Sequence, residues 1–302
     1  MKATDIVALV RDRGPLTGAE LRDALPGNVL ALWRSCVRSP ELLVRRVGQR
    51  YLRLDRQVAG FARMSPSILR EFMTYAIVGL AADPGAVEGR AQAVMSHTQQ
   101  VTRAKRELAR TTVSEIVEPL RAAGFDEQRF CVLIAGDIVY EMAHDVPRPE
   151  RSTGKLVNGS DLDLVFIADD DAPDSMVREL DQAIHQKKAR LLRDPMTREE
   201  IDYIVKRLER IREQLAFDEF KRMVACKILH EGEFLHGNQS LFAKAKSLLV
   251  EHGVVAKLEA LTKTAEAARR HAEEQLARHD SGDMTDEERQ FLYTAEESEE
   301  FE

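Results

Sequence analysis

Cysteine is scarce in this chain of 302 residues. The three cysteines, Cys36, Cys131 and Cys226, lie far apart and form no CxxC pair, which argues against both a zinc knot and a disulfide framework. Each has apolar neighbours, as is typical of small buried side chains in a protein from a reducing compartment.

Long apolar runs are lacking as well. No segment approaches the roughly 18 consecutive apolar residues that a membrane span requires. The opening segment MKATDIVALVRDRG interrupts its short apolar stretch with charged residues, which excludes a signal peptide. We therefore expect a cytoplasmic protein with no membrane partner.

What the chain does contain is the composition of an ordinary globular protein, 44% hydrophobic and 31% charged, with a net charge of −7. Its length suits two domains, or one domain with additions. The charge is uneven: residues 27–56 hold seven arginines against one glutamate and one aspartate, a balance of 7 − 2 = +5. The C-terminal stretch TAEESEEFE is acidic and is expected to be a solvated tail.

Residues 1–60 have the pattern of three short helices followed by two short strands. The first helix covers residues 4–13, Thr17 and Glu20 form a capping box for the second, and the third spans roughly 28–38. LLVRRVGQRYLRLD then predicts a hairpin that turns at Gly48 and Gln49. This order resembles a winged helix-turn-helix, in which the third helix reads a groove and the wing touches the backbone.

The winged-helix resemblance implies nucleic-acid contacts from the third helix and the wing. The implied residues are Arg34 and Arg38 on the helix and Arg45, Arg46, Arg50 and Arg53 on the wing. A helical module that docks a protein partner is the alternative, because small modules of this kind serve both purposes.

The rest of the chain predicts an α+β fold with a small mixed sheet, flanking helices and a helical C-terminal part. A helical connector is expected over residues 61–123, with helices at 66–82 and 86–123. In a core over residues 124–240, RFCVLIAGD and LDLVFIA predict strands and IVYEMAHD a helix. Residues 241–302 are expected to be helical before the acidic tail.

Two aspartates stand one residue apart at the head of the second of these strands. Asp161 and Asp163 are i and i+2 in an extended chain, so their carboxylates point the same way. Adjacent carboxylates raise each other's pKa unless a cation neutralises them, and magnesium shares carboxylate ligands with phosphate oxygens. Paired aspartates also occur in turns without a metal, but the preceding strand that ends at Gly136 favours a metal site.

This pattern resembles the DNA polymerase β-like nucleotidyltransferase superfamily over roughly residues 128–240. The resemblance places Gly136 at the family's glycine position and Asp161 and Asp163 at its metal-binding pair. It implies a third carboxylate on a later strand, for which Asp202 in EIDYIVK fits best and Glu200 is the substitute. It further implies that two Mg²⁺ or Mn²⁺ ions bind an NTP such as ATP, activate an acceptor hydroxyl and stabilise the leaving pyrophosphate.

The same resemblance implies a set of nucleotide-binding residues and shows two departures. The set is Gly136, Asp137, Ser160, Lys155 and Lys227, with phosphate received at the N-terminus of a helix after Gly136. Asp137 is the first departure, because the family places serine or glycine there. The second is the interval from Gly136 to Asp161, 161 − 136 = 25 residues, which is longer than usual. Its polar residues Arg148, Arg151, Ser152, Thr153 and Lys155 are expected to close over a triphosphate.

The expected function is transfer of NMP from an NTP to an acceptor, which is an RNA end, a protein hydroxyl or a second nucleotide. The N-terminal module would recognise the acceptor or a partner. A regulator with a degenerate, nucleotide-sensing domain is the alternative that the charge at Asp137 keeps open, and a toxin or antitoxin component is a third. Tyr203, beside Asp202, is expected in the core, with stacking on a base as its alternative role.

Overall fold

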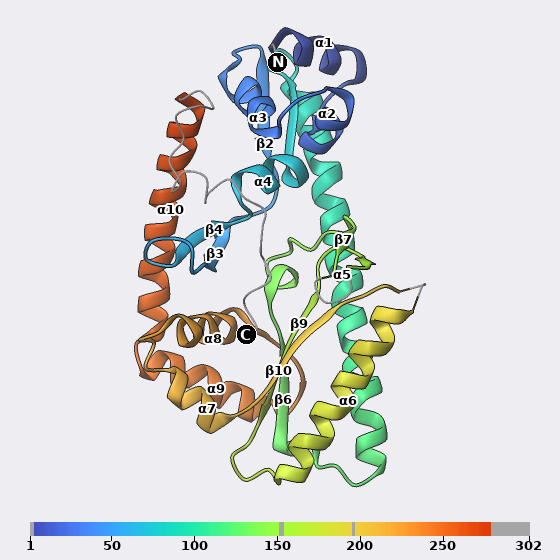
Figure 1. Cartoon of the computed structure of the whole chain (residues 1–302), viewed down its shortest axis with the longest axis vertical. Helices are drawn as coiled ribbons and strands as arrows, with labels where there is room; N and C mark the ends of the chain where they lie inside the picture. Colours follow the sequence, from blue (N-terminus) through green and yellow to red (C-terminus); the bar gives the residue numbers. More distant parts are fainter. Residues whose placement is uncertain (1–2, 151–153, 195–196, 279–302) are drawn as a thin grey trace. The chain divides into compact units, whose positions relative to one another are not determined.

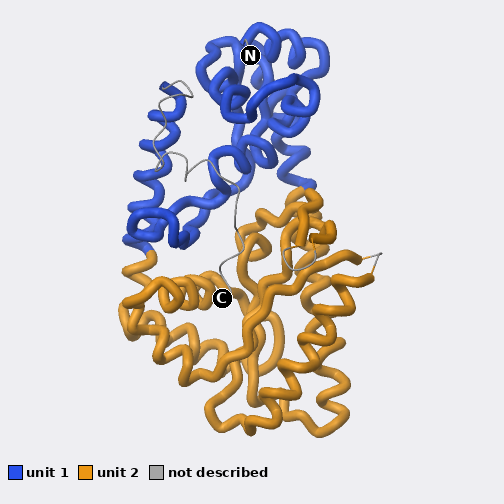
Figure 2. The backbone as a smooth tube through the Cα atoms, in the orientation of Figure 1, with its two compact units in different colours: residues 1–97, 259–299 blue, residues 98–258, 300–302 orange. Residues whose placement is uncertain are grey.

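The computed structural model describes residues 3–150, 154–194 and 197–278 (Figure 1). These residues form two compact units (Figure 2). Unit 1 holds residues 3–97 and 259–278, and unit 2 holds the remaining described residues up to 258. Residues 259–278, which the sequence assigns to a C-terminal region, therefore group with the N-terminal residues. Within the described ranges, no helix has both the length and the apolar character needed to cross a membrane.

Unit 1 alternates short helices and short strands. Its elements are α1 (Ala3–Arg13), β1 (Leu16–Thr17), α2 (Gly18–Ala24), α3 (Val29–Arg38), β2 (Leu42–Arg46), β3 (Tyr51–Leu54), β4 (Ala62–Ser65), α4 (Ile68–Tyr75), β5 (Ala76–Leu80), the start of α5 (Pro84–Ala122) and most of α10 (Val254–Arg278). The predicted capping box is confirmed: the Glu20 N–H donates to Thr17 Oγ1 at 3.2 Å, and the Thr17 N–H donates to Glu20 Oε2 at 2.7 Å.

The predicted hairpin after the third helix is wrong. Both strands form, but β2 pairs with β5, Leu42 opposite Leu80, whereas β3 pairs with β4. The larger sheet has the order β1-β5-β2. Along the chain, β3, β4 and α4 are inserted between β2 and β5. The central strand decides this pairing, because β5 carries the fully buried Ile77 and Val78 and hydrogen-bonds on both sides.

The helix predicted over residues 66–82 is correct only in its first half. Helix α4 ends at Tyr75 and the chain continues directly into β5. The β-branched residues Ile77 and Val78 favour a strand over a helix, and the following Gly79 disfavours the helix. The apolar core of unit 1 joins α1, α3 and α4 to the last turns of α10, with Ile6, Trp33, Phe72 and Leu276 among its members.

Unit 2 contains a four-stranded mixed sheet with flanking helices, so the α+β class predicted from the sequence is confirmed. Besides the main part of α5 and the start of α10, its elements are η1 (Glu127–Arg129), β6 (Phe130–Ile134), η2 (Gly136–Ile138), β7 (Arg148–Pro149), β8 (Leu156–Val157), β9 (Leu162–Ala168), α6 (Asp174–Arg193), β10 (Ile201–Arg207), α7 (Leu208–Gln214), α8 (Phe220–Glu231), β11 (Glu233–Gly237) and α9 (Gln239–Glu251). The strand order is β10-β9-β6-β11, with β10 parallel to β9 and the other pairs antiparallel.

One face of this sheet is apolar and packs against α5 and α6. Leu162, Leu164 and Phe166 of β9 lie in the same cluster as Ile201 of β10 and Val113 of α5. Because side chains alternate along a strand, the residues between them on β9 and β10 point to the opposite face. Asp163 and Asp202 are among these, so the packing of one face determines which residues the other face presents.

Candidate metal centre

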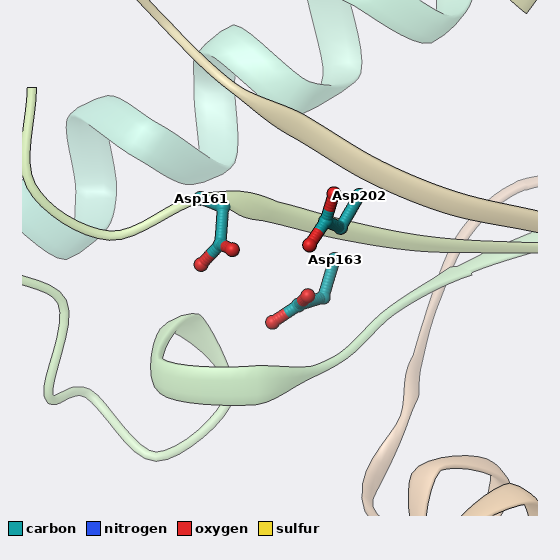
Figure 3. A group of neighbouring side chains, drawn as sticks. All are labelled: Asp161, Asp163 and Asp202. Carbon is teal, nitrogen blue, oxygen red and sulfur yellow. The ribbon is translucent and has the colours of Figure 1, made fainter. Parts of the chain in front are cut away.

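Three aspartates converge at the start of β9 and β10. Asp161 immediately precedes β9, Asp163 is its second residue and Asp202 is the second residue of β10. The parallel register places Asp163 directly opposite Asp202. One carboxylate oxygen from each of the three lies within 4.8 Å of the others (Figure 3). The structure thus brings together the pair and the third carboxylate that the sequence selected separately.

Gly136, two residues after the end of the neighbouring strand β6, makes this arrangement possible. Its φ is +69°, in the left-handed region, and a Cβ there would lie 1.9 Å from Asp163 Oδ2. Any side chain at this position would therefore displace the Asp163 carboxylate. The Ala135 N–H donates to the Asp163 carbonyl at 3.0 Å, which holds the two segments at this distance.

The helix predicted after Gly136 does not form. Only one 3-10 turn follows, Gly136–Ile138, and the expected phosphate site at a helix N-terminus is absent from this described segment. The turn is held from the side: Tyr140 Oη donates to Glu231 Oε2 at 2.5 Å, and the Gly136 N–H donates to Glu231 Oε1 at 3.3 Å. These tertiary contacts override the helical spacing of IVYEMAHD.

Asp137 and Ser160 bind each other at the edge of the site. Ser160 Oγ donates to Asp137 Oδ2 at 2.8 Å and accepts the His144 N–H at 3.1 Å. The Ser160 hydroxyl, which the resemblance assigns to nucleotide binding, therefore donates its hydrogen bond to the carboxylate of Asp137. Asp137 also adds negative charge near Asp161, and its charge is one cause that raises the pKa of that residue.

Arg148 is the cation that contacts the first of the three aspartates, Asp161. Its Nη2 atom lies 3.2 Å from Asp161 Oδ2 and 3.0 Å from Glu200 Oε2, and its Nε donates to the Gly159 carbonyl at 2.8 Å. Of the insert residues predicted to close over a triphosphate, Arg148 thus lies at the site, whereas Arg151, Ser152 and Thr153 lie outside the described residues. The acidic C-terminal tail lies outside them too.

Burial and mutual repulsion disfavour the charged carboxylates here. Burial raises the pKa of Asp161, Arg148 opposes this rise, and the charges of Asp202 and Asp137 add to it. Burial likewise raises the pKa of Glu200 to about 7, again against the effect of Arg148. Glu200, the substitute third carboxylate, is therefore a buried partner of Arg148, while Asp202 faces the aspartate pair. A divalent cation would relieve this excess of negative charge.

Lys105 is a site residue that the sequence analysis missed. Its buried Nζ, on α5, donates to the carbonyls of Asn158 and Ser160 and to the carboxylate of Glu199. It thereby ties the loop that leads into Asp161 to the residues that lead into β10. The sequence offered only a spacing: residues 98, 102, 105, 109 and 112 recur at three- and four-residue intervals and Lys105 is the charged one among them. Their burial on α5 is visible only in the structure.

The two predicted phosphate-binding lysines lie in different places. Lys227 is buried in an ion pair with Glu231, its Nζ 2.9 Å from Oε2, and so supports the turn at Gly136. Lys155 lines a cavity together with Lys188 and Tyr203. Lys188 Nζ lies 3.1 Å from Asp202 Oδ1, so this cavity adjoins the third carboxylate.

Arg34 and Arg38, the predicted readers on the third helix, cap the end of α10 within unit 1. Arg34 Nε donates to the Leu276 carbonyl at 2.6 Å, and Arg38 donates to the Ala277 carbonyl. The last carbonyls of a helix have no partner within it, and arginine side chains satisfy them well. Arg34 is also buried, so the prediction that it reads a nucleic-acid groove does not fit its position in this structure.

The predicted wing arginines divide into buried and exposed residues. Arg53 is buried on β3, and Arg50 forms ion pairs with Glu71, at 2.6 Å, and with Glu273. Arg45 pairs with Glu88, yet its side chain and that of Arg46 remain 50% and 46% exposed. These two residues are the predicted wing contacts that a nucleic acid could reach.

Comparisons with protein-family models, with curated proteins and with solved structures find no significant match to this chain.

Proposed function

We propose that this chain is a metal-dependent nucleotidyltransferase, a divergent member of the DNA polymerase β-like superfamily, that transfers NMP from an NTP to an acceptor. The observation that carries the proposal is the convergence of Asp161, Asp163 and Asp202 from two adjacent parallel strands. Gly136, in the turn that follows the antiparallel strand β6, leaves room for the carboxylate of Asp163.

The donor set suits Mg²⁺ or Mn²⁺. Carboxylate oxygens are the hard ligands that these ions prefer, and Asp161, Asp163 and Asp202 would hold the metal. Bound there, the metal would supply Lewis-acid activation of the acceptor hydroxyl and charge stabilisation at the phosphates. In the transfer, the acceptor hydroxyl would give up its proton to water and its oxygen would form a bond to the α-phosphorus. The bond from that phosphorus to the bridging oxygen would break, and pyrophosphate would leave.

The chain's own cations would position the phosphates. Arg148, 3.2 Å from Asp161, would contact the phosphates of the NTP, whereas Lys188 lies 3.1 Å from Asp202. Lys105 would act as a positioning residue, because it fixes the backbone before Asp161 through the Ser160 carbonyl. Lys227 and Ser160 would contribute indirectly, since their polar atoms bind Glu231 and Asp137.

Unit 1 would recognise the acceptor or a partner. Its element order is helix, strand, two helices and two strands with an insertion before the last strand, which supports the winged-helix interpretation with the insertion in place of a simple wing. The exposed Arg45 and Arg46 would contact an acidic surface, nucleic acid included. A DNA or RNA contact of this kind weakens as the salt concentration rises.

The alternative is a regulator whose unit 2 binds a nucleotide without turnover. Arg148 favours this alternative, because a cation of the chain already partly neutralises Asp161. The position of Asp202 favours catalysis over nucleotide binding alone, because its carboxylate lies beside those of Asp161 and Asp163.

The test uses α-labelled NTPs with Mg²⁺, alone and with total RNA or total lysate protein, and follows label transfer and pyrophosphate release. We expect activity in the natural protein and its loss in Asp161→Asn/Asp163→Asn. Asp171→Asn, which removes an exposed carboxylate beyond the end of β9, is the matched control and should retain activity. Activity that persists in the double variant would refute the proposal, and NTP binding without turnover would favour the sensing alternative.

A further inference from the structure

A second feature of unit 2 is a cationic cavity beside β10. It has a volume of about 400 Å³ and lies along the C-terminal half of α6, the start of β10 and the segment before β8. Three cations line it, Lys155, Lys188 and Arg193, together with His185, Tyr203 and two apolar residues. Among the described residues none of its lining side chains is a carboxylate. Asp202, beside Lys188, and Asp181, which hydrogen-bonds Tyr203, contact lining side chains from outside the cavity.

These cations are more than stabilisers of a helix end. Positive side chains in the last turn of a helix interact favourably with its dipole, and this accounts for Arg193 alone. Lys155 belongs to a different segment, and Lys188 lies more than one turn before the end of α6. The three charges meet only because the tertiary structure places them around one hollow, and like charges gathered in this way attract an anion.

The cavity is linked to the carboxylates through Lys188. Its Nζ lies 3.1 Å from Asp202 Oδ1 while the side chain also lines the cavity. Asp202 and Tyr203 are consecutive residues of the edge strand β10, so they point to opposite faces of the sheet. Lys188 thus reaches around the edge of the sheet and connects the two sites.

We propose that this cavity binds a second nucleotide unit, the phosphate-bearing acceptor, with its phosphate on Lys188, Lys155 and Arg193 and its base against Tyr203. The apolar side chains of Ala189 and Leu192 complete the surface for the base or sugar. Stacking of a base on an aromatic ring together with cationic contacts to the backbone is the general way in which proteins bind single nucleotide units. The acceptor role rests on the proposed function, whereas nucleotide binding itself does not.

The link through Lys188 predicts coupling between the two sites. A divalent cation on Asp202 would take over the negative charge that now holds Lys188, and the lysine would then be available to the phosphate. Nucleotide binding should in turn tighten metal binding by the same factor, because coupling between two sites is reciprocal.

The test is calorimetric titration of the full chain with each 5′-NMP, which cannot act as an NMP donor, and with the matching nucleosides and inorganic phosphate. We expect at least one 5′-NMP to bind and its nucleoside and phosphate to bind much more weakly. Lys188→Met and Arg193→Met should each weaken NMP binding by about tenfold, the equivalent of one charge-assisted hydrogen bond. Arg178→Met, on an exposed position of the same helix, should leave it unchanged.

Repeating the titration with Mn²⁺ tests the coupling. We expect Mn²⁺ to tighten NMP binding by about fivefold or more, and Lys188→Met to abolish that effect. A chain in which no 5′-NMP binds, or in which Lys188→Met and Arg193→Met bind it normally, overturns this proposal. NMP binding that survives in Asp161→Asn/Asp163→Asn while NTP turnover is absent even from the natural protein would overturn the proposed function instead.

Discussion

Gly136 is the position where one added methyl group would test the geometry of the whole carboxylate site. In Gly136→Ala, the left-handed φ of +69° costs roughly 1–2 kcal/mol for a residue with a Cβ. The new Cβ would also lie 1.9 Å from Asp163 Oδ2. That oxygen is the end of a flexible side chain, so the clash is relieved by rotating Asp163 away from Asp161 and Asp202. We therefore expect a modest loss of stability and a large loss of metal binding.

The magnitude of the binding loss follows from the ligand count. Replacing groups that merely orient metal ligands weakens metal binding about 10–100-fold, so removing one of three ligands should weaken it by at least ~10-fold. Titration with Mn²⁺ measures the affinity, and urea denaturation measures the free energy of unfolding.

Gly253→Ala provides the matched control. Gly253 has nearly the same φ, +66°, but nothing lies within 4 Å of its Cβ position. Both variants should lose a similar roughly 1–2 kcal/mol of unfolding free energy, and only Gly136→Ala should lose Mn²⁺ affinity. If Gly136→Ala binds Mn²⁺ as tightly as Gly253→Ala, the carboxylates do not form the metal site in this geometry.

Two further variants test the charges in unit 2. Arg148→Gln removes a cation from beside Asp161. Repulsion between that cation and a Mn²⁺ ion about 5 Å away in a water-like dielectric amounts to about 1–2 kcal/mol, so the variant should bind Mn²⁺ roughly tenfold more tightly. An unchanged or weaker affinity in the titration would show that Arg148 and the metal do not compete for Asp161. Burial lowers the pKa of Lys206 from 10.5 to about 8, so between these values the unfolded chain binds more protons and stability rises with pH. Lys206→Met lacks this titration, so its unfolding free energy relative to the natural protein should fall by about 3 kcal/mol from pH 7 to above pH 10.5. Urea denaturation at several pH values measures this difference. A difference that does not change with pH would refute the lowered pKa of Lys206.

Local sequence determined most of the elements that build the candidate site. The apolar run of β9 predicts a strand, and the i, i+2 spacing places Asp161 and Asp163 on one side of it. Alternation in the segment that begins at Asp202 predicts β10 in the same way. Short-range rules also sufficed for the capping box at Thr17, because its two hydrogen bonds join residues three positions apart.

Strand pairing was decided by tertiary structure. The sequence from Leu42 to Leu54 contains two strands that look like a hairpin, yet β2 pairs with β5, which begins at Ala76. A strand can pair with a distant strand instead of its neighbour in the chain when the distant pairing buries more apolar surface. Here β2 pairs with β5, whose Ile77 and Val78 are fully buried. The same competition turned the second half of the predicted helix at 66–82 into a strand.

The partners of individual charged residues were also decided by contacts between residues far apart in the sequence. Arg34 meets the Leu276 carbonyl, 242 positions along the chain, and Lys105 meets Glu199, 94 positions along. No local pattern encodes such a partner, because burial of a charge depends on which distant acceptors surround it. Residue type and spacing thus determined which carboxylates point the same way, whereas the register of β9 against β10 alone brought Asp202 to them.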